Sequence, residues 1–400
     1  MSRLASLRPI GQIARYDVVG RLATGGMAEI FLARQAGPQE VARHLVVKRM
    51  LPHFADDERM VEMFVHEARL SLNLRHPHIC AVYDFGDDQG RFYLAMEWVR
   101  GVSLRELLMR VGPLPIPFLV KVFADLAGAL HHAHVCTDAR GEPLHIVHRD
   151  VNPENLMVGF DGVAKLLDFG VAKARNQRQK TEVGAVKGKF AYISPEQYQG
   201  LPLDGRSDVF SLGVSLYEGL TGGSLYDRAS EYETVAAIVL DPNVPSARKA
   251  RPDVPADLDA IVQRAMAKDR DHRYPSADAL AMDLEAYLAR RGLLLRHADV
   301  ASTLAGLVPE LAAAEPKLDR KLGLAPTPDT GRHEPVDRLQ AALLAAEADE
   351  DAEALLGRRR RTGRWLGWVS ALLILVSLGV VGWVVLREPV SPPPAISPAE

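Results

Sequence analysis

The spacing of hydrophobic residues divides the chain into regions with different secondary structure. From Tyr16 to about residue 100, short β-branched and aromatic runs alternate with glycine-containing and charged loops. This pattern is typical of a small antiparallel sheet, and one stretch within it, about 59–74, has helical spacing instead. The runs expected to form strands are 16–19, 28–32, 45–48, 79–85 and 92–96.

From Gly101 to about residue 290 the pattern changes. Apolar residues recur three and four positions apart over long segments, namely 119–134, 207–220, 258–267 and 277–290. Such spacing gives each helix one apolar face, which indicates a mainly helical region. The sequence therefore predicts an α+β protein with two lobes, a small antiparallel-sheet lobe with one helix over 16–100 and a larger helical lobe over 101–290.

The residues on either side of these lobes are expected to be accessory. Residues 1–15 carry three arginines among leucines and isoleucines but lack the apolar core of a secretory signal, so we expect a leader that packs on or frays from the small lobe. Residues 291–364 begin with a helical stretch and continue through a turn-rich sequence at 325–331. The acidic run at 347–353 is typical of a solvated helix face. We expect 291–364 to be a juxtamembrane linker, because an apolar segment long enough to span a membrane follows it.

Residues 365–386 contain no charged side chain. A helix of these 22 residues, at about 1.5 Å per residue, spans roughly the 30 Å core of a bilayer. Tryptophans lie near both ends, where indole favours the membrane interface. We expect one transmembrane helix here rather than a buried core helix, because core helices of this length are rarely free of charge and little chain follows to bury it.

The distribution of arginine gives this helix an orientation. Arginines occupy 358–361 and 364 on its N-terminal side, against Arg387 alone on the other side. By the positive-inside rule the lobes are cytoplasmic, in a single-pass protein of the cell inner membrane that contacts membrane lipid. The proline-rich residues 387–400 are then a disordered external tail. The arginine run also fits a nuclear-import or nucleic-acid patch, but it directly adjoins the apolar segment.

Overall composition excludes several classes of protein. A formal net charge of −3 over 400 residues gives no basic field for nucleic acid, so no nucleic-acid partner is expected. The two cysteines, Cys80 and Cys136, are too few for a disulfide framework or a cysteine-rich zinc site, which fits a reducing compartment.

Two polar motifs in the second lobe carry the candidate chemistry. His148-Arg149-Asp150 is followed by Asn155, and the triplet Asp168-Phe169-Gly170 begins 18 residues after Asp150. With these motifs and their spacing, the chain resembles the eukaryotic-like (Hanks-type) protein serine/threonine kinases. The reaction that this resemblance implies, phosphoryl transfer, requires a metal ion, phosphates and an acceptor hydroxyl to be held in line, and oxygen ligands of this kind suit magnesium.

The resemblance implies a protein-kinase fold, the cofactors ATP and Mg²⁺, and protein substrates. Asp150 would accept the proton of the acceptor hydroxyl or orient that hydroxyl, and Asn155 and Asp168 would bind the magnesium. Lys48 would contact the nucleotide phosphates and pair with Glu67, which lies 19 residues later on the single helix of the small lobe.

The same resemblance implies the residues that surround ATP. Residues 22–30 match a glycine-rich loop that covers the phosphates, and 96–99 match a hinge whose backbone binds adenine between apolar walls. The implied set is Leu22, Ala23, Thr24, Gly25, Gly26, Met27, Ala28, Glu29, Ile30, Val46, Lys48, Glu97, Val99 and Met157. Taken singly, a Gly-Gly pair also makes an ordinary hairpin, and a lysine at the end of a strand is usually a solvated residue. Ala23 and Ala28 replace glycines of the family loop.

The segment between Asp168 and Ser194-Pro195-Glu196 resembles the family's activation segment. Its middle is basic, and Thr181 is its threonine, so a phosphate there would pair with Arg149 and order the segment. We therefore expect regulation by autophosphorylation. The resemblance also implies two structural roles: an ion pair between Glu196 and Arg273, and an anchor for the catalytic loop at Asp208.

Two positions depart from the family pattern. Asn152 stands where these kinases usually have a lysine, and Lys189 replaces a threonine of the substrate-docking loop. Both changes bear on turnover and acceptor choice, but every charged role is still filled.

Three functions remain open at this point. The favoured hypothesis is a membrane-anchored serine/threonine kinase of the bacterial branch, which residues 25–28 and 194–196 resemble. The alternatives are a nucleotide-responsive pseudokinase scaffold and a small-molecule kinase, which the long activation segment disfavours. A homodimer is suggested by Gly379 and Gly382 in the apolar segment, and the sequence indicates neither the substrate nor the activating signal.

Overall fold

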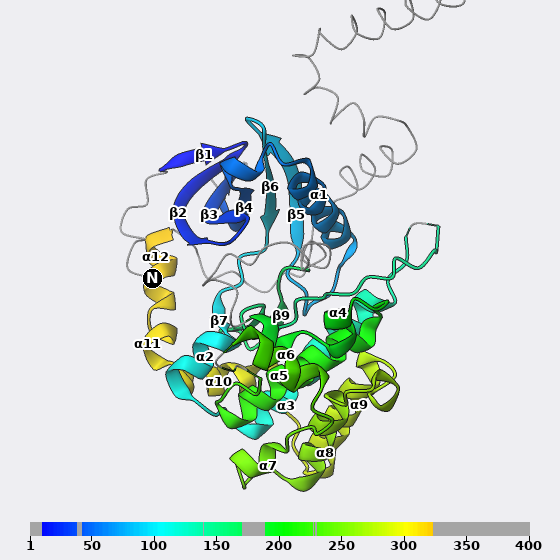
Figure 1. Ribbon diagram of the computed structural model, residues 1–400. Coiled ribbons are helices and arrows are strands. Elements are labelled where there is room, and N and C mark those ends of the chain that lie inside the picture. Colours follow the sequence, from blue (N-terminus) through cyan, green and yellow to red (C-terminus); the bar gives the residue numbers. More distant parts are fainter. Residues whose placement is uncertain are drawn as a thin grey trace, which may run out of the picture. The chain divides into compact units, whose positions relative to one another are not determined.

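A computed structural model describes residues 10–37, 42–138, 140–169, 189–226, 228 and 230–322. All of them belong to one compact unit, residues 1–333, and are arranged in two lobes (Figure 1). The expected transmembrane segment 365–386, the external tail 387–400 and Thr181 lie outside the described residues. Within the described part of the chain, no helix is long and apolar enough to cross a bilayer.

The small lobe is a six-stranded antiparallel sheet with one long helix beside it (Figure 1). Its strand order is β1-β2-β3-β4-β6-β5. The strands are β1 (Gly11–Ile13), β2 (Tyr16–Thr24), β3 (Ala28–Ala36), β4 (Ala42–Met50), β5 (Val82–Asp88) and β6 (Arg91–Met96). Short turns join most neighbours, as expected for antiparallel pairing, and the expected sheet with a single helix is confirmed.

The helix of this lobe, α1 (Glu58–Asn73), begins at a clear capping residue. The Asp57 carboxylate accepts hydrogen bonds from the backbone N–H groups of Arg59 and Met60, which the helix itself leaves unpaired. The buried face of α1 consists of Val61, Phe64, Glu67, Ala68, Ser71 and Leu72. Helical spacing thus carries one carboxylate, that of Glu67, into the interior together with the apolar side chains.

Residues near the N-terminus of the chain form part of the small-lobe sheet. Strand β1 pairs with β2, and Ile13 is only 1% exposed. Asp84, a buried carboxylate, accepts hydrogen bonds from Arg15 (2.8 Å), Tyr16 (2.7 Å) and Tyr93 (3.3 Å). Residues 10–15, the described part of the segment expected as a leader, therefore contribute a strand and a polar contact with Asp84 to the small lobe.

The large lobe is mainly helical, with a small sheet, β7-β8-β9, where it meets the small lobe (Figure 1). The long helices α3 and α5 form its centre: α5 is buried along most of its length, and α3 packs against α5 and α9. The strands are β7 (Gly101–Ser103), β8 (Leu156–Gly159) and β9 (Ala164–Leu166). The helices are α2 (Leu104–Val111), α3 (Ile116–His134), α4 (Pro195–Gln199), α5 (Gly205–Thr221), α6 (Glu231–Val239), α7 (Ala247–Ala250), α8 (Ala256–Ala265) and α9 (Ala277–Arg290), with short 3-10 helices at Pro52–Phe54, Lys189–Tyr192 and Arg270–His272.

The helical packing of this lobe continues past residue 290, where the linker was expected to begin. Three further helices follow: α10 (His297–Leu307), α11 (Pro309–Ala312) and α12 (Glu315–Leu322). Val300, Leu304 and Val308 are at most 2% exposed and belong to the large-lobe core. Burial of these side chains makes α10 part of the lobe, so the boundary expected at 290 differs from the structure.

Ion pairs hold the rest of this C-terminal extension, residues 297–322, against the lobe. Glu315 pairs with Arg100 (2.6 Å), and Glu310 pairs with Arg110 (3.1 Å). Arg100 lies directly after the segment 96–99 that joins the lobes, so the extension reaches this junction. The spacing of hydrophobic residues along the sequence did not predict these contacts, because α11 and α12 are short and polar.

We predict that Leu304→Ala lowers the free energy of unfolding of the full-length chain by about 2–5 kcal/mol, because it leaves a cavity in a fully buried site. Chemical denaturation followed by circular dichroism measures the change. Leu294→Ala is the matched control, since Leu294 is 91% exposed. Equal effects of the two substitutions would contradict the assignment of α10 to the lobe core.

Candidate active site

A buried lysine lies at the junction of the lobes. Lys48 is on β4, and its ammonium group contacts Glu67 of α1 (2.7 Å) and Asp168 (3.1 Å). Burial by itself would lower the pKa of Lys48, but the charges of Asp168 and Glu67 hold it above its ordinary value. The lysine therefore stays a cation inside the protein, and the two carboxylates fix its position.

The two carboxylates around Lys48 differ in their access to solvent. The Glu67 side chain is 7% exposed, whereas that of Asp168 is 33% exposed. The expected pair between Lys48 and Glu67 is thus formed in the interior, and the structure adds a second partner on the open side. A ligand that approaches from that side meets the ammonium group and the Asp168 carboxylate together.

The hairpin of β2 and β3 covers one side of the site. Its turn closes through a hydrogen bond from Gly25 N–H to the Ala28 carbonyl (2.8 Å). Residues 22–26 are exposed, whereas Ala28 is buried at 3%. The Glu29 carboxylate contacts Arg21 (3.1 Å) and Arg49 (3.6 Å), so this side chain stabilises the hairpin.

The remaining residues expected around adenine come from four strands and the joining segment. Val46 is buried on β4, opposite Leu32 and Met96. Ile30 pairs with Lys48 across the sheet, and Met157 lies on β8 in the large lobe. Strands β3 and β4 of the small lobe and β8 of the large lobe thus carry the expected apolar side chains, whereas Leu22 is exposed at 44%.

The joining segment is fastened by the Glu97 side chain, a contact that the sequence reasoning missed. Its carboxylate accepts hydrogen bonds from the Ala81 N–H (3.1 Å) and from Lys165 of β9 (2.8 Å). The backbone N–H of Glu97 also donates to the Ala81 carbonyl (2.7 Å). Glu97 therefore fixes the path of the segment, and any contact with adenine falls to backbone groups of 97 and 99. Lys165 is far from Glu97 in the sequence, so no sequence motif predicts this pair.

The catalytic-loop residues form a compact hydrogen-bonded group. Asn155 donates its side-chain N–H groups to the backbone carbonyl (2.8 Å) and the carboxylate (2.9 Å) of Asp150. Asn152 donates to the same carbonyl (2.8 Å) and accepts from the Glu154 N–H (3.0 Å). Asn152, which stands where the family usually has a lysine, therefore fits into the loop. Its side-chain amide holds the turn on which Asp150 and Asn155 lie.

One buried aspartate anchors the start of this loop. Asp208 is 0% exposed and accepts hydrogen bonds from the backbone N–H groups of His148 (2.8 Å) and Arg149 (2.9 Å). His134 at the end of α3 is a third partner (2.8 Å). Burial would raise the pKa of Asp208, but the hydrogen bond and charge of His134 hold it below its usual value. Asp208 plays the expected anchoring part, whereas the sequence did not single out His134, because it is one of three histidines in the last turn of α3.

Arg149 and Asp168 adopt left-handed backbone conformations, with φ of 65° and 43°. Such conformations are unfavourable for residues other than glycine and persist where neighbouring contacts impose them. At Arg149 both backbone groups are held: Asp208 accepts from its N–H, and Gln197 donates to its carbonyl (3.0 Å). The chain direction at Arg149 is therefore set by tertiary contacts.

A buried aromatic contact links the two motifs. The rings of His148 and Phe169 lie 4.5 Å apart, and each residue is at most 2% exposed. His148 also has its Nε2 atom 2.9 Å from the Leu167 carbonyl, and burial lowers the pKa of the ring. This packing places Asp168, the residue before Phe169, next to Lys48.

Farther from Lys48, the expected pair of Glu196 and Arg273 is formed. Two hydrogen bonds of 2.6 and 2.8 Å join the guanidinium to the carboxylate, and Ser207 donates a third to Glu196 (2.6 Å). Burial would raise the pKa of Glu196, but Arg273 holds it below its ordinary value. The backbone of Lys189 begins a 3-10 helix, and its side chain lies outside the described parts.

The donor set suits magnesium and a nucleotide. Asn155 uses its amide nitrogen for Asp150, which leaves the amide oxygen as its ligand atom, and Asp168 offers a partly exposed carboxylate. Hard oxygen atoms of this kind are the ligands that Mg²⁺ prefers, together with phosphate. Lys48 supplies a fixed positive charge for phosphate at the same place.

Comparison with known proteins agrees with this geometry. The family model described as "Protein kinase domain" matches residues 16–284. Tyrosine-protein kinase MasK of Myxococcus xanthus is 42% identical over 287 residues, which cover 71% of this chain and 44% of that protein. Serine/threonine-protein kinase PrkC of Bacillus subtilis is 32% identical, with 68% of this chain and 40% of that protein covered.

Further similarities extend the comparison. Serine/threonine-protein kinase PknL of Mycobacterium tuberculosis is 37% identical over 273 residues, which cover 68% of this chain and 65% of that protein. The chain thus spans less than two thirds of the length of these three relatives. A crystal structure of the M. tuberculosis PknI kinase domain is 28% identical, with a TM-score of 0.54, and covers 72% of this chain and 100% of that domain.

The matched region contains every element of the site: Lys48, its carboxylate partners, the catalytic loop and the buried aspartate behind it. It leaves out only the first strand, the end of α9 and the C-terminal extension among the described elements. Over residues 16–284, this chain belongs to the protein kinase family, with bacterial Hanks-type serine/threonine kinases among its relatives.

Proposed function

We propose that the chain is an active protein kinase that transfers the γ-phosphoryl group of ATP to hydroxyl groups of proteins. The observation that carries this proposal is the position of Lys48 between Glu67 and Asp168. A buried ion pair fixes one geometry of the small-lobe helix, so the lysine is already directed toward the place where phosphate would bind.

The residues around Lys48 divide the work of phosphoryl transfer. Asp150 accepts the proton of the acceptor hydroxyl or orients that hydroxyl, while its hydrogen bond to Asn155 keeps the carboxylate in place. Asn155 and Asp168 would hold Mg²⁺, which would supply positive charge to stabilise the phosphates. Lys48 stabilises negative charge on the nucleotide, and the backbone of 97 and 99 positions adenine.

We propose serine and threonine as the acceptors. Most of the relatives described above are named serine/threonine kinases. Tyrosine is the second candidate, because the relative of 42% identity is named a tyrosine kinase and because Asn152 replaces the lysine usual in serine/threonine kinases. The Asn152 side chain is buried and donates a hydrogen bond to the Asp150 carbonyl, so it can affect acceptor choice only through the shape of the catalytic loop.

We predict that Asp150→Asn lowers the turnover rate by about 10²–10⁴-fold, because it removes the proton acceptor. Lys48→Met should lower it by about 10²–10³-fold, because it removes a fixed charge that faces the phosphates. Transfer of label from γ-labelled ATP, with Mg²⁺ and a general protein substrate, measures both effects in the full-length chain. Lys249→Met, which changes an exposed lysine, is the control.

Equal labelling by the wild type and all three variants would exclude catalysis by this site and favour the scaffold. Phosphoamino-acid analysis of the labelled protein then identifies the acceptor. Phosphoserine and phosphothreonine are expected, and label found only on phosphotyrosine would contradict the proposed acceptor class while leaving kinase activity intact.

We also propose that phosphorylation of Thr181 activates the enzyme. Arg149 supports this idea, because its Nε atom is buried and has no hydrogen-bond partner among the described residues. A phosphothreonine carries roughly −1.5 to −2 charges, and a guanidinium is its usual partner. The charge would order the segment that precedes the docking loop.

We predict that wild-type chain incubated with Mg²⁺ and ATP carries phosphate on Thr181, as measured by mass spectrometry of peptides. Thr181→Ala should reduce the rate of substrate labelling at least about tenfold, because the ordering charge is lost. Ser302→Ala, at an exposed helical position, is expected to have no effect. Full activity of an unmodified segment would refute this regulation.

We further propose that residues 365–386 anchor the kinase as a single helix in the cell inner membrane, with the lobes in the cytoplasm. The basis is the charge-free run and the arginines before it. Pairing of two such helices through Gly379 and Gly382 would bring two kinases together.

We predict that the full-length chain stays with the membrane fraction after alkaline carbonate extraction, because about 20 apolar residues suffice for stable insertion. A chain that ends at Arg364 should move to the soluble fraction. Release of the full-length chain by carbonate would contradict the anchor without bearing on the kinase activity.

A further inference from the structure

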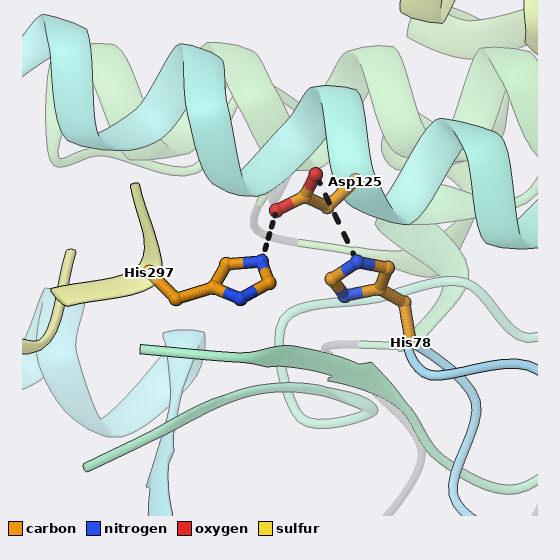
Figure 2. Close-up of side chains that lie close together, drawn as sticks. All are labelled: His78, Asp125 and His297. Atoms are coloured by element: carbon orange, nitrogen blue, oxygen red, sulfur yellow. Dashed lines mark ion pairs between the residues drawn. The ribbon is translucent and has the colours of Figure 1, made fainter. Parts of the chain in front are cut away.

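Three potential metal ligands meet on the large lobe at a place that has no part in the proposed phosphoryl transfer. His78 lies in the loop between α1 and β5, Asp125 on α3, and His297 at the first position of α10. Figure 2 shows both imidazole rings turned toward the Asp125 carboxylate, one from each side. The cluster thus joins the small-lobe connection, a core helix and the C-terminal extension.

The distances within the cluster suit a shared cation. His78 Nε2 is 3.8 Å from Asp125 Oδ1, and His297 Nε2 is 3.7 Å from Asp125 Oδ2 (Figure 2). All three ligand atoms lie within 4.8 Å of one another. Two ligands of a tetrahedral zinc ion, each at about 2.0–2.1 Å, are separated by about 3.3 Å. Small movements of the side chains would therefore bring all three into a first coordination sphere.

The second nitrogen of His78 determines what its Nε2 atom offers. Nδ1 lies 2.9 Å from the backbone carbonyl of Ala164, and because a carbonyl only accepts, Nδ1 carries the hydrogen. Nε2 of the neutral ring then directs a lone pair toward a carboxylate, and a cation bound between the two groups would relieve this repulsion. A histidine whose other N–H donates to a backbone carbonyl is the usual arrangement of a metal ligand.

Exposure and neighbouring charges also bear on the site. The side chains of His78 and Asp125 are 11% and 10% exposed, whereas that of His297 is 44% exposed, which leaves an entry path and access for a water ligand. Lys121 contacts Asp125 Oδ1 (2.6 Å), so Oδ2, on the side of His297, is the oxygen better placed for a metal. His76 lies beside His78, with the two ring centroids 5.6 Å apart.

We propose that His78, Asp125 and His297 bind a divalent transition-metal ion, with zinc as the ion that best fits two imidazoles and one carboxylate. The ion would fasten the C-terminal extension to the lobe, because His297 begins α10. It would also hold the loop of His78, whose carbonyl accepts a hydrogen bond from the Leu166 N–H (2.9 Å) on the strand that leads to Asp168. The site is distinct from the magnesium ligands Asn155 and Asp168.

The test is zinc binding by the full-length chain after removal of metal with a chelator. Isothermal titration with Zn²⁺ alone as the probe, in excess Mg²⁺ to fill oxygen-ligand sites, should reveal one site per chain that His297→Ala weakens by more than about 100-fold. His297 is partly exposed, so this variant should fold normally. His272→Ala is the matched control, because His272 is 80% exposed and has a single carboxylate neighbour, Asp269.

A second readout identifies the ligands. Co²⁺ bound by the wild type should give the visible absorption bands typical of nitrogen and oxygen ligands. His297→Ala should lose these bands, whereas His272→Ala should keep them. Equal zinc affinity in the wild type and His297→Ala, or no zinc binding by a folded wild type, would overturn the proposal and leave the cluster as an ion pair. ATP takes no part in these measurements, so their outcome is independent of the proposed kinase activity.

Discussion

The buried ammonium group of Lys48 is the contact on which the arrangement of the lobes around the site depends. A lone cation in this position would be strongly unfavourable, and its two carboxylate partners come from different parts of the chain. Glu67 requires α1 to lie against the sheet, and Asp168 requires the second motif to turn toward the small lobe. The two ion pairs of the Lys48 ammonium group therefore fix the helix, the sheet and the motif relative to one another.

Buried carboxylates play a comparable part in the large lobe. Asp208 holds the backbone before Asp150, and Glu196 holds Arg273 and Ser207. Each carboxylate collects several donors, which offsets the cost of removing its charge from water. The left-handed backbone at Arg149 persists because Asp208 and Gln197 hold its two polar groups. The proposed catalytic group at Asp150 is thus positioned by residues that would not touch the substrate.

The C-terminal extension adds a third layer of support. Its apolar side chains join the large-lobe core, and its charged residues reach Arg100 beside the segment between the lobes. His297 brings the same extension to His78 and Asp125, so one segment contacts the core, the junction and the loop after α1. The family match ends at residue 284, before the extension begins.

Periodicity and motif spacing were sufficient to predict the sheet lobe, the helical lobe, the catalytic loop and the pairing of Lys48 with Glu67, because these depend on local patterns or on strings of residues that recur in the family. The strand at 11–13, the packing of α10 and the roles of His134, Glu97 and Asn152 were not predictable in this way. Each depends on contact between residues far apart in the chain, such as Glu97 with Lys165. A hydrophobic pattern shows which face of an element is buried; only the folded chain decides which partner covers that face.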